Sequence, residues 1–220
     1  EISLGLVGSE MCIRDRIRRR GMKILLVNKY FNMHGGSETY FFGLADLLRQ
    51  AGHEVIFFAM QDEKNLPCEQ SAYFVSNVEF NGELTATQKL KAAFRMVYSF
   101  EAKKKISALI EKEKPDIIHI NLFHRVLTAS IVDAAKKHGI PVVLTMHDLN
   151  CVCPNHVMLD HGKICEACLH GNYWNCVKRV CFKDSRAKCL MAAIESDFNK
   201  RSGLYRNCLL YTSPSPRDRG

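Results

Sequence analysis

Three short polar or glycine-rich stretches carry residue types that bind sugars and phosphates. The first contains Gly35 and Gly36, which precede a stretch of helical periodicity. Glycine lets a backbone approach a ligand closely and accepts positive φ, and the free N–H groups at a helix start bind phosphate. The pair therefore predicts either a phosphate-binding corner or a tight turn. It belongs neither to a G-x-G-x-x-G dinucleotide fingerprint nor to a Gly-Lys-Ser/Thr phosphate loop.

The other two stretches each contain a histidine that follows or ends an apolar run. His119 lies with Asn121 in one, and His147 lies with Asp148 in the other. An imidazole at such a place can donate to a sugar hydroxyl, position a leaving group or act as a base. Asp148 would hold that imidazole or cap a turn. The competing interpretation of all four residues is structural hydrogen bonding at strand ends.

The elements that must position these residues alternate between strand and helix. Short apolar runs indicate buried parallel strands, and periodic stretches ended by glycine or proline indicate helices. The expected strands are 23–28, 53–60, 116–120 and 142–146, with a weak one at 73–75, and the expected helices are 37–51, 87–112 and 126–138. This order predicts an α/β fold, with an open parallel sheet and helices on both faces.

The first helix and the rim of the sheet carry more specific expectations. Ser37 is expected to cap the helix, whose buried stripe is expected to comprise Tyr40, Leu44, Leu47, Leu48 and Ala51. Ligands of open α/β sheets bind beyond the carboxyl ends of the strands. The glycine pair and the two histidine stretches all belong to that edge, so we expect Gly36 and His147 to line one pocket.

Ten cysteines occur in the chain, and seven of them lie between residues 151 and 189. We call residues 150–189 the Cys-rich segment. No secretory signal is recognised, so a reducing compartment is expected, where disulfides are disfavoured. Cys165 and Cys168 have the spacing that places two thiolates on one zinc ion, which Cys153 and either Cys181 or Cys176 would complete. The alternative is a set of packed free thiols.

The overall composition is that of a globular protein. The 220 residues are 47% hydrophobic and 25% charged, with a formal net charge of +8, which permits anionic partners. No apolar run reaches the roughly 18–20 residues that span a bilayer. Residues 1–21 and 207–220 resemble translated sequencing adapters and are predicted to be non-native. Setting them aside lowers the positive charge, so no nucleic-acid partner is expected.

The expected helix 87–112 is strongly basic on one side. Lys103, Lys104 and Lys105 give it positive charge, while Phe94 and Ile106 belong to an apolar side. Such a helix can lie on an anionic membrane. The simpler interpretation is a solvated basic face over a normally packed helix.

Residues 22–55 resemble the opening of the family 4 glycosyltransferases. That family has a strand, a loop ending in Gly-Gly-x-Glu, an amphipathic helix and then Gly-His-x-Val. The 115–119 stretch (PDIIH) resembles the family's strand ending in histidine, and the 145–148 stretch (TMHD) resembles its Thr-x-His-Asp motif. Cys153-Pro154 and the later cysteines resemble a Cys-rich subgroup of the family. The matching residues of the first motif are Gly35, Gly36, Glu38, Gly52, His53 and Val55.

The resemblance implies a GT-B enzyme, built from two Rossmann-like domains that face each other across a cleft. Residues 22–206 would form its N-terminal, acceptor-side domain, with the Cys-rich segment as an insertion, and a donor-binding domain would follow. Such an enzyme moves a hexose from a nucleotide-sugar donor to a hydroxyl of a glycan or lipid-linked acceptor, with retention, in polysaccharide synthesis. No cofactor is needed for the transfer. A cytoplasmic location at the inner face of the membrane is expected, and this chain alone would be inactive.

The resemblance also assigns roles to residues. Gly35 and Gly36 would contact the donor phosphate or the acceptor, and His147 would reach toward the transferred sugar. The resemblance also extends to Glu38, Asn121 and Asp148 as further site residues, and His119 ends the strand that closes in histidine in the family. The alternative function is a non-catalytic, zinc-stabilised α/β binding module with a basic surface. In both cases the expected zinc ligands are Cys153, Cys165, Cys168 and Cys181.

Overall fold

The computed structural model describes residues 21–77 and 85–212. Its main sheet has five strands in the order β2-β1-β3-β4-β7, and every neighbouring pair is parallel. The predicted open parallel sheet is therefore confirmed. Its strands are β1 (Lys23–Val27), β2 (Glu54–Phe58), β3 (Ile117–Ile120), β4 (Val142–Met146) and β7 (Leu209–Thr212).

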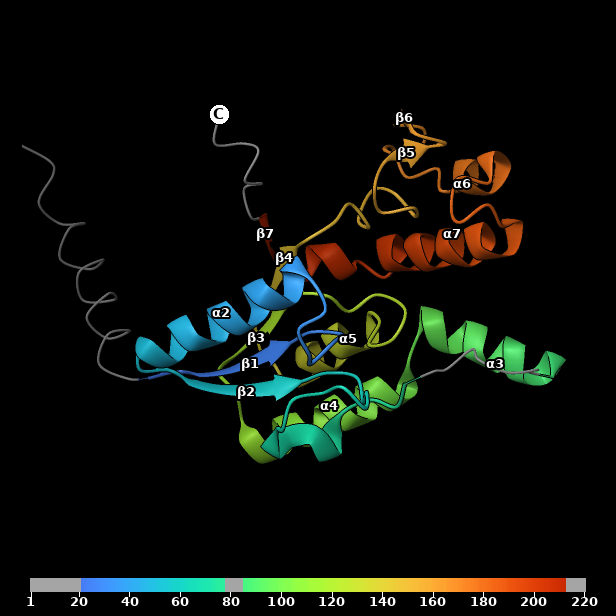
Figure 1. Ribbon diagram of the computed structural model, residues 1–220. Coiled ribbons are helices and arrows are strands. Elements are labelled where there is room, and N and C mark those ends of the chain that lie inside the picture. The colour runs from blue at the N-terminus through green and yellow to red at the C-terminus, as the bar shows by residue number, and fades with distance from the viewer. Residues whose placement is uncertain (1–20, 78–84, 213–220) are drawn as a thin grey trace, which may run out of the picture.

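Helices cover both faces of this sheet (Figure 1). Helix α2 (Gly36–Gln50) packs on the face that carries Ile24 and Leu26 of β1. Helices α4 (Phe100–Glu113) and α5 (Ser130–Lys137) pack on the opposite face, against Leu25 and Val27. Successive strand side chains point to opposite faces, so the continuous apolar run of β1 fills both cores. These features make the fold a Rossmann-like α/β unit.

The buried face of α2 differs from the predicted stripe. Phe41 and Ala45 are buried, whereas Leu47 is 64% exposed. Ser37 is not the cap, because the helix begins one residue earlier and Gly35 occupies the N-cap position without a side-chain bond. The hydroxyl of Ser37 instead donates to Glu38 Oε2 at 2.9 Å. The predicted stripe was wrong because this helix is rich in Tyr, Phe and Leu, so that several different apolar stripes fit its sequence.

The predicted helix 87–112 is two helices, α3 (Ala86–Val97) and α4, which meet at a buried serine. Ser99 caps α4, since its hydroxyl accepts from the N–H of Ala102 at 3.1 Å. Its own N–H donates to Thr128 Oγ1 at 2.9 Å. Both bonds need a non-helical Ser99, so the break follows from capping chemistry that helical periodicity does not report.

Two of the three lysines expected to form a basic face on this stretch contact neighbouring groups. Lys105 forms an ion pair with Glu101 at 3.2 Å, and Lys103 Nζ donates to the hydroxyl of Tyr98 at 2.8 Å. Ile106 is fully buried, while Phe94 is 69% exposed. The apolar side is therefore shared between the core and the surface. No helix in residues 21–77 and 85–212 is long and apolar enough to cross a membrane.

Smaller elements complete the fold. The weak strand expected at 73–75 is a single bridge between Met60 and Val75 that follows the 3-10 helix η1 (Glu69–Tyr73), and α5 begins four residues later than predicted. The Cys-rich segment folds into a hairpin and a short helix. These elements are β5 (Leu159–Asp160), β6 (Lys163–Ile164) and α6 (Trp174–Arg179), and α7 (Arg186–Arg201) and η2 (Leu204–Arg206) follow.

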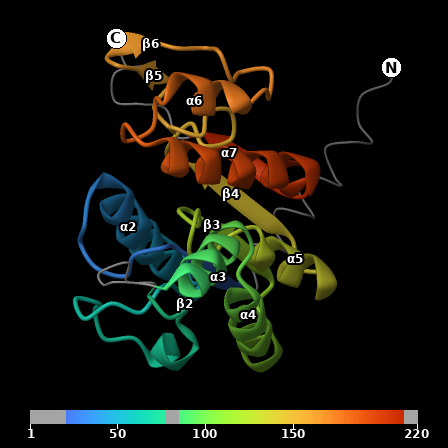
Figure 2. The same cartoon turned by 90° about the vertical axis from the view of Figure 1, so that its right-hand side faces the viewer.

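Helix α7 has no counterpart among the predicted elements. It lies beside α3 and carries the Cys-rich segment above the sheet (Figures 1 and 2). Of the two runs predicted to be non-native, residues 1–20 and 213–220 lie outside the described part of the chain. Strand β7 falls within the second run and pairs with β4, and the origin of both runs stays a prediction.

Candidate functional site

The candidate site begins where the strand order reverses. The chain passes from β1 to β2 on one side and then to β3 on the other side of β1. The carboxyl ends of β1 and β3 therefore flank the crevice in which open α/β sheets bind ligands. Asn28, which directly follows β1, is fully buried there, and its Oδ1 accepts from the N–H of Leu122, just after β3, at 3.1 Å.

The amide of Asn28 also connects this crevice to the first turn of α2. Its Nδ2 donates to Glu38 Oε1 at 3.1 Å and to the carbonyl of Tyr30 at 2.8 Å. Glu38 is only 1% exposed, and its negative charge lies where the helix dipole favours it. Sequence analysis missed Asn28, although a polar residue directly after an apolar strand is a signal for it.

The glycine corner has an open approach. Gly35 is extended with φ of −170°, and neither glycine adopts a left-handed backbone conformation. The expected need for positive φ is therefore absent. Both glycines are exposed, and a Cβ added to Gly36 would meet nothing within 4 Å. The first N–H groups of a helix have no partner within it, so the start of α2 offers donors at an exposed corner.

His147 lies at the same edge as the glycine corner. Its ring contacts that of Tyr40, in the second turn of α2, with centroids 5.1 Å apart. Its Nε2 is 2.9 Å from Asn121 Oδ1. Burial lowers the pKa of His147, against the opposing charges of Asp148 and Glu38. The ring is therefore neutral at pH 7, and the tautomer protonated at Nε2 donates to Asn121.

Asn121 carries an unused hydrogen-bond donor. The residue is 2% exposed, and its Nδ2 has no partner among the described residues. A buried N–H without a partner costs about 1–3 kcal/mol. A hydroxyl group bound beside His147 would remove this cost, so the amide marks a place for a polar ligand.

His119 lies deeper than the sequence predicts. It is the penultimate residue of β3, and its Nε2 is 2.7 Å from Thr145 Oγ1 on β4. Burial, with a smaller contribution from His147, lowers the pKa of His119 to about 4. The structure thus places a neutral, internally bonded ring under the site, and ligand contact by His119 stays a prediction.

Asp148 caps the turn after β4, one of its two predicted roles. Its Oδ1 accepts from the N–H of Asn150 at 3.0 Å, and its Oδ2 accepts from the side-chain amide of the same residue at 2.6 Å. It also lines a cavity of about 330 Å³. Among the residues around that cavity, the positively charged ones come from three segments and are Lys29, Arg125 and Lys183.

These three cations were not identified from the sequence. Lys29 follows β1 by two residues, but Arg125 and Lys183 belong to a turn and to the end of the Cys-rich segment. Arg125 lies over the ring of Phe182, 4.5 Å from its centroid, and its Nε is 3.5 Å from Glu195 Oε2 on α7. Only tertiary packing brings these segments to the sheet edge, so no spacing in the sequence reports them.

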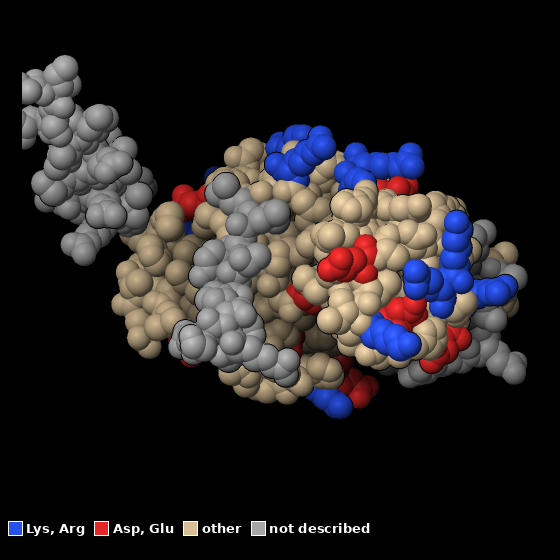
Figure 3. Space-filling model, turned by 90° about the horizontal axis from the view of Figure 1, so that it is seen from above, with Lys and Arg blue, Asp and Glu red and all other residues tan. Residues whose placement is uncertain are grey.

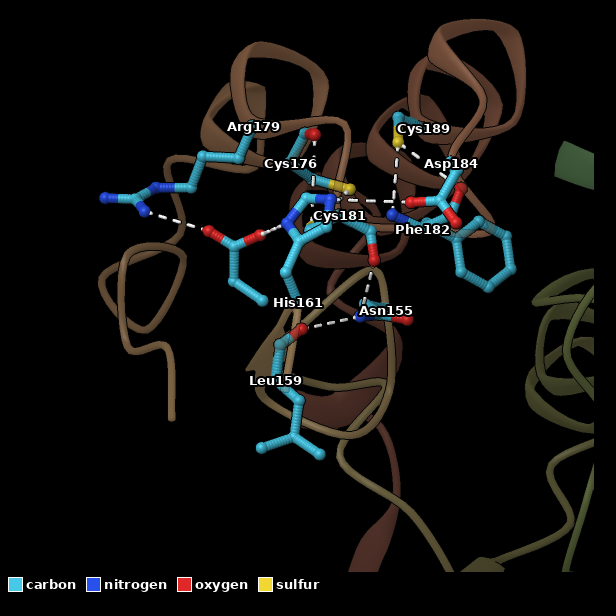
Figure 4. Close-up of polar contacts among 10 residues, drawn as sticks. Asn155, Leu159, His161, Cys176, Arg179, Cys181, Phe182, Asp184 and Cys189 are labelled. Carbon is cyan, nitrogen blue, oxygen red and sulfur yellow. Dashed lines mark hydrogen bonds and ion pairs between the residues drawn. The ribbon is translucent and has the colours of Figure 1, made fainter. Parts of the chain in front are cut away.

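The cysteines form a small cluster of their own (Figure 4). Cys176 Sγ and Cys181 Sγ are 3.4 Å apart, and Cys189 Sγ accepts from the N–H of Phe182 at 3.3 Å. Burial and the charges of Cys153, Cys181 and Cys165 raise the pKa of Cys168 to about 11. Every described cysteine is a free thiol.

The four expected zinc ligands are therefore neighbours, but they do not form a ready metal site. Within the described ranges, no group of three or more His, Cys, Asp or Glu side chains is arranged to hold a metal ion. Thiol side chains would have to rotate toward a common centre to bind zinc. Zinc binding by Cys153, Cys165, Cys168 and Cys181 stays a prediction.

On the upper face of the molecule, basic side chains lie among acidic ones (Figure 3). Within the Cys-rich segment, Arg179 pairs with Asp160 at 3.0 Å. This face therefore gives no support to a binding module that works through a continuous basic surface.

Comparisons with known proteins identify a family for most of the chain. A family model described as Glycosyltransferase Family 4 matches residues 34–180. A search of curated proteins finds no match. Among solved structures, the chain is similar to MurG of Acinetobacter baumannii, with 16% identity, a TM-score of 0.38 and 59% of this chain covered. It is also similar to an alpha-glucosyltransferase solved with UDP and DNA, with 19% identity, a TM-score of 0.32 and 59% covered. The chain spans 36% and 31% of the lengths of these two proteins.

Proposed function

The chain belongs to glycosyltransferase family 4, and from this premise we propose that it supplies the acceptor-side half of a retaining enzyme. That enzyme would transfer a hexose from a nucleotide-sugar donor to a hydroxyl acceptor in glycan or polysaccharide synthesis. The family match covers residues 34–180, which include the glycine corner, both histidine stretches and most of the Cys-rich segment. The alternative of a non-catalytic binding module has no comparable support.

The observation that carries the proposal is the shared position of the α2 start and His147. Tyr40 joins them through its ring contact with His147, and Glu38, two residues before Tyr40, accepts from the side-chain amide of Asn28. A diphosphate would bind the open N–H groups at Gly35 and Gly36, because a helix start favours negative charge. Preorganised donors of this kind stabilise the charge that develops on a leaving diphosphate.

The neighbouring side chains would hold the sugar. His147 would contact the transferred sugar while Asn121 fixes the orientation of its ring. The free Nδ2 of Asn121 would bind a sugar hydroxyl. Transfer itself would need no metal ion. In the whole enzyme a second, donor-binding domain would close the cleft, so the 220-residue chain alone would not turn over.

The test uses the protein translated from the intact gene, with the 220-residue chain assayed beside it. A panel of nucleotide hexoses identifies a donor by release of the nucleotide diphosphate. We expect His147→Ala to lower kcat by about two orders of magnitude with an unchanged circular dichroism spectrum. His170→Ala, a change of an exposed histidine, is the matched control and leaves kcat unchanged.

Three results would contradict the proposal. Unchanged turnover in His147→Ala would remove that residue from the site. Inversion at the anomeric carbon of the product, measured by proton NMR, would exclude the retaining mechanism. Turnover by the 220-residue chain alone would show that no second domain is needed.

A further inference from the structure

The polar cavity that Asp148 lines adjoins the candidate site along the chain. It has a volume of about 330 Å³, within the range of roughly 300–1,000 Å³ that is typical of small-ligand sites. Three of its lining residues directly follow a polar residue of the candidate site, and these are Lys29 after Asn28, Leu122 after Asn121 and Asp148 after His147. A ligand in this cavity therefore lies next to the residues proposed to hold the transferred sugar.

Arg125 lines this cavity from a strained backbone position. Its φ is +70°, a left-handed value that arginine seldom adopts. The buried carboxylate of Glu195 holds it there, because one oxygen accepts from the N–H of Arg125 at 3.0 Å and the other lies 3.5 Å from its Nε. The guanidinium also packs on the ring of Phe182. Strain that is maintained by surrounding contacts is found at ligand-binding positions, and Nη1 of Arg125 has no partner among the residues that the structure describes.

The charges around the cavity leave one positive charge unbalanced. Lys29 and Lys183 form no ion pair with a described acidic side chain. Glu195 offsets Arg125, and Asp148 offsets one lysine. Among the Lys, Arg, Asp and Glu side chains here, the cations thus outnumber the carboxylates by one. A ligand carboxylate carries one negative charge at pH 7, whereas a phosphate monoester carries nearly two, so the surplus matches a carboxylate.

The cavity also offers surfaces that suit a sugar ring. Tyr30 lines it and stacks on His34, with ring centroids 4.7 Å apart and planes 20° apart. Asn150 and His156 line it as well, and their side chains are of types that form hydrogen bonds with hydroxyl groups. An aromatic ring with a small number of polar groups is typical of small-molecule sites. The cavity therefore combines an anion-binding part with a part that fits a sugar.

We propose that the acceptor carries a uronic acid unit, whose carboxylate is bound in this cavity by Arg125, Lys29 and Lys183. The sugar ring of that unit then lies beside His147 and presents a free hydroxyl to the transferred hexose. The hydroxyl oxygen bonds to the anomeric carbon of the hexose, the nucleoside diphosphate leaves with the electron pair of the broken bond, and the hydroxyl proton passes to that diphosphate. The transfer rests on the proposed function, but uronate binding does not require it.

The test measures binding to the 220-residue chain at pH 7 by titrations with saturation-transfer difference NMR. The probes are the methyl glycosides of glucuronic acid and galacturonic acid, the uncharged amide of each, acetate and glucose 6-phosphate. We expect at least one uronate to bind about tenfold more tightly than its amide, since the amide loses charge-assisted hydrogen bonds.

Four results would overturn the proposal. Neither uronate binds, or both bind no more tightly than their amides. Acetate binds as tightly as the uronates, which would mean a simple anion site. Glucose 6-phosphate binds more tightly than the uronates, which would mean a phosphate site.

Variants with a matched control locate the site. Lys29→Gln with Lys183→Gln removes both unpaired ammonium groups and is expected to weaken uronate binding about tenfold. Lys136→Gln with Lys137→Gln removes the same charge from the exposed end of α5 and leaves binding unchanged. Arg125→Lys keeps the charge but loses the planar fork, and is expected to weaken uronate binding about fivefold. Equal effects of the two lysine pairs, or unchanged binding in Arg125→Lys with an unchanged circular dichroism spectrum, would refute the location.

The outcome is separable from that of the proposed function. Binding needs no turnover, so a failed transfer assay leaves the uronate site intact. Transfer to a neutral acceptor by the whole enzyme, without uronate binding to the chain, would retain the glycosyltransferase and refute the acidic acceptor.

Discussion

The buried ring of His119 makes a measurable prediction about stability and pH. Its pKa falls from an ordinary 6.5 to about 4, chiefly through burial and secondarily through the neighbouring His147. Between these two values the unfolded chain binds a proton at this residue and the folded chain does not. Stability therefore rises with pH across that window, and it is lost as the pH falls from 6.5 toward 4.

The magnitude follows from the two pKa values. At pH 7 both states are largely neutral and the contribution is close to zero. At pH 5 the proton that the unfolded state binds destabilises the fold by about 2 kcal/mol, and by pH 4 by about 3 kcal/mol. In His119→Gln this dependence disappears, while an amide can still bond to Thr145. The free energy of unfolding of the variant, relative to the wild type, should thus increase by about 2 kcal/mol between pH 7 and pH 5.

Urea unfolding followed by circular dichroism at both pH values measures this difference. With a slope of about 2 kcal/mol per molar urea, the midpoint of the variant relative to the wild type should move by about 1 M between the two conditions. His170→Gln, at an exposed site, controls for the loss of a histidine and should show no such movement. If the urea midpoints of the wild type and His119→Gln differ by the same amount at pH 7 and at pH 5, a neutral ring at His119 is refuted.

Two further predictions concern the glycine corner and the cysteines. An added Cβ meets nothing within 4 Å at either Gly36 or Gly43 of α2, so the Gly36→Leu and Gly43→Leu proteins should both fold. In the whole enzyme only Gly36→Leu should raise the KM for the nucleotide sugar, by about tenfold. Equal KM values for the two variants would contradict phosphate binding at the glycine corner. The chain purified without chelator should carry about one zinc ion in its Cys-rich segment, as measured by inductively coupled plasma mass spectrometry. If adding zinc to a metal-free preparation leaves its unfolding temperature unchanged, the prediction is contradicted.

Much of the sheet could be predicted from the sequence because buried parallel strands are short, continuous apolar runs. Strand β4 has the bounds predicted from Pro141, and β1 ends one residue before the predicted Asn28. The helices were less predictable for a physical reason. The break at Ser99 depends on its bond to Thr128, which is distant in the sequence. Local periodicity does not report that bond, and it therefore predicted one helix where the structure has two.

The candidate site divides in the same way. Gly36 and His147 follow strand ends, and parallel strands bring such residues to one edge, which is why an approach of α2 to His147, seen in the ring contact of Tyr40, could be expected. That Gly36 and His147 line one pocket stays a prediction. Asn28 was missed because its importance lies in its bonds to two other segments, at Glu38 and Leu122. Lys183 was missed because it reaches the sheet edge only through the folding of the Cys-rich segment.

That dependence links the Cys-rich segment to the polar cavity that Lys183 and Asp148 line. Cys181, Phe182 and Lys183 are consecutive, and each of the first two is fixed by its neighbours. The side chain of Asn155 donates to the carbonyl of Cys181 at 2.8 Å, and Phe182 donates through its N–H to Cys189. These contacts also fix the position of Lys183, because the ring of Phe182, the preceding residue, packs against Arg125. A change that loosens the thiol cluster should therefore displace Lys183 from that cavity before it affects the sheet, since the main core lies in a separate set of side chains.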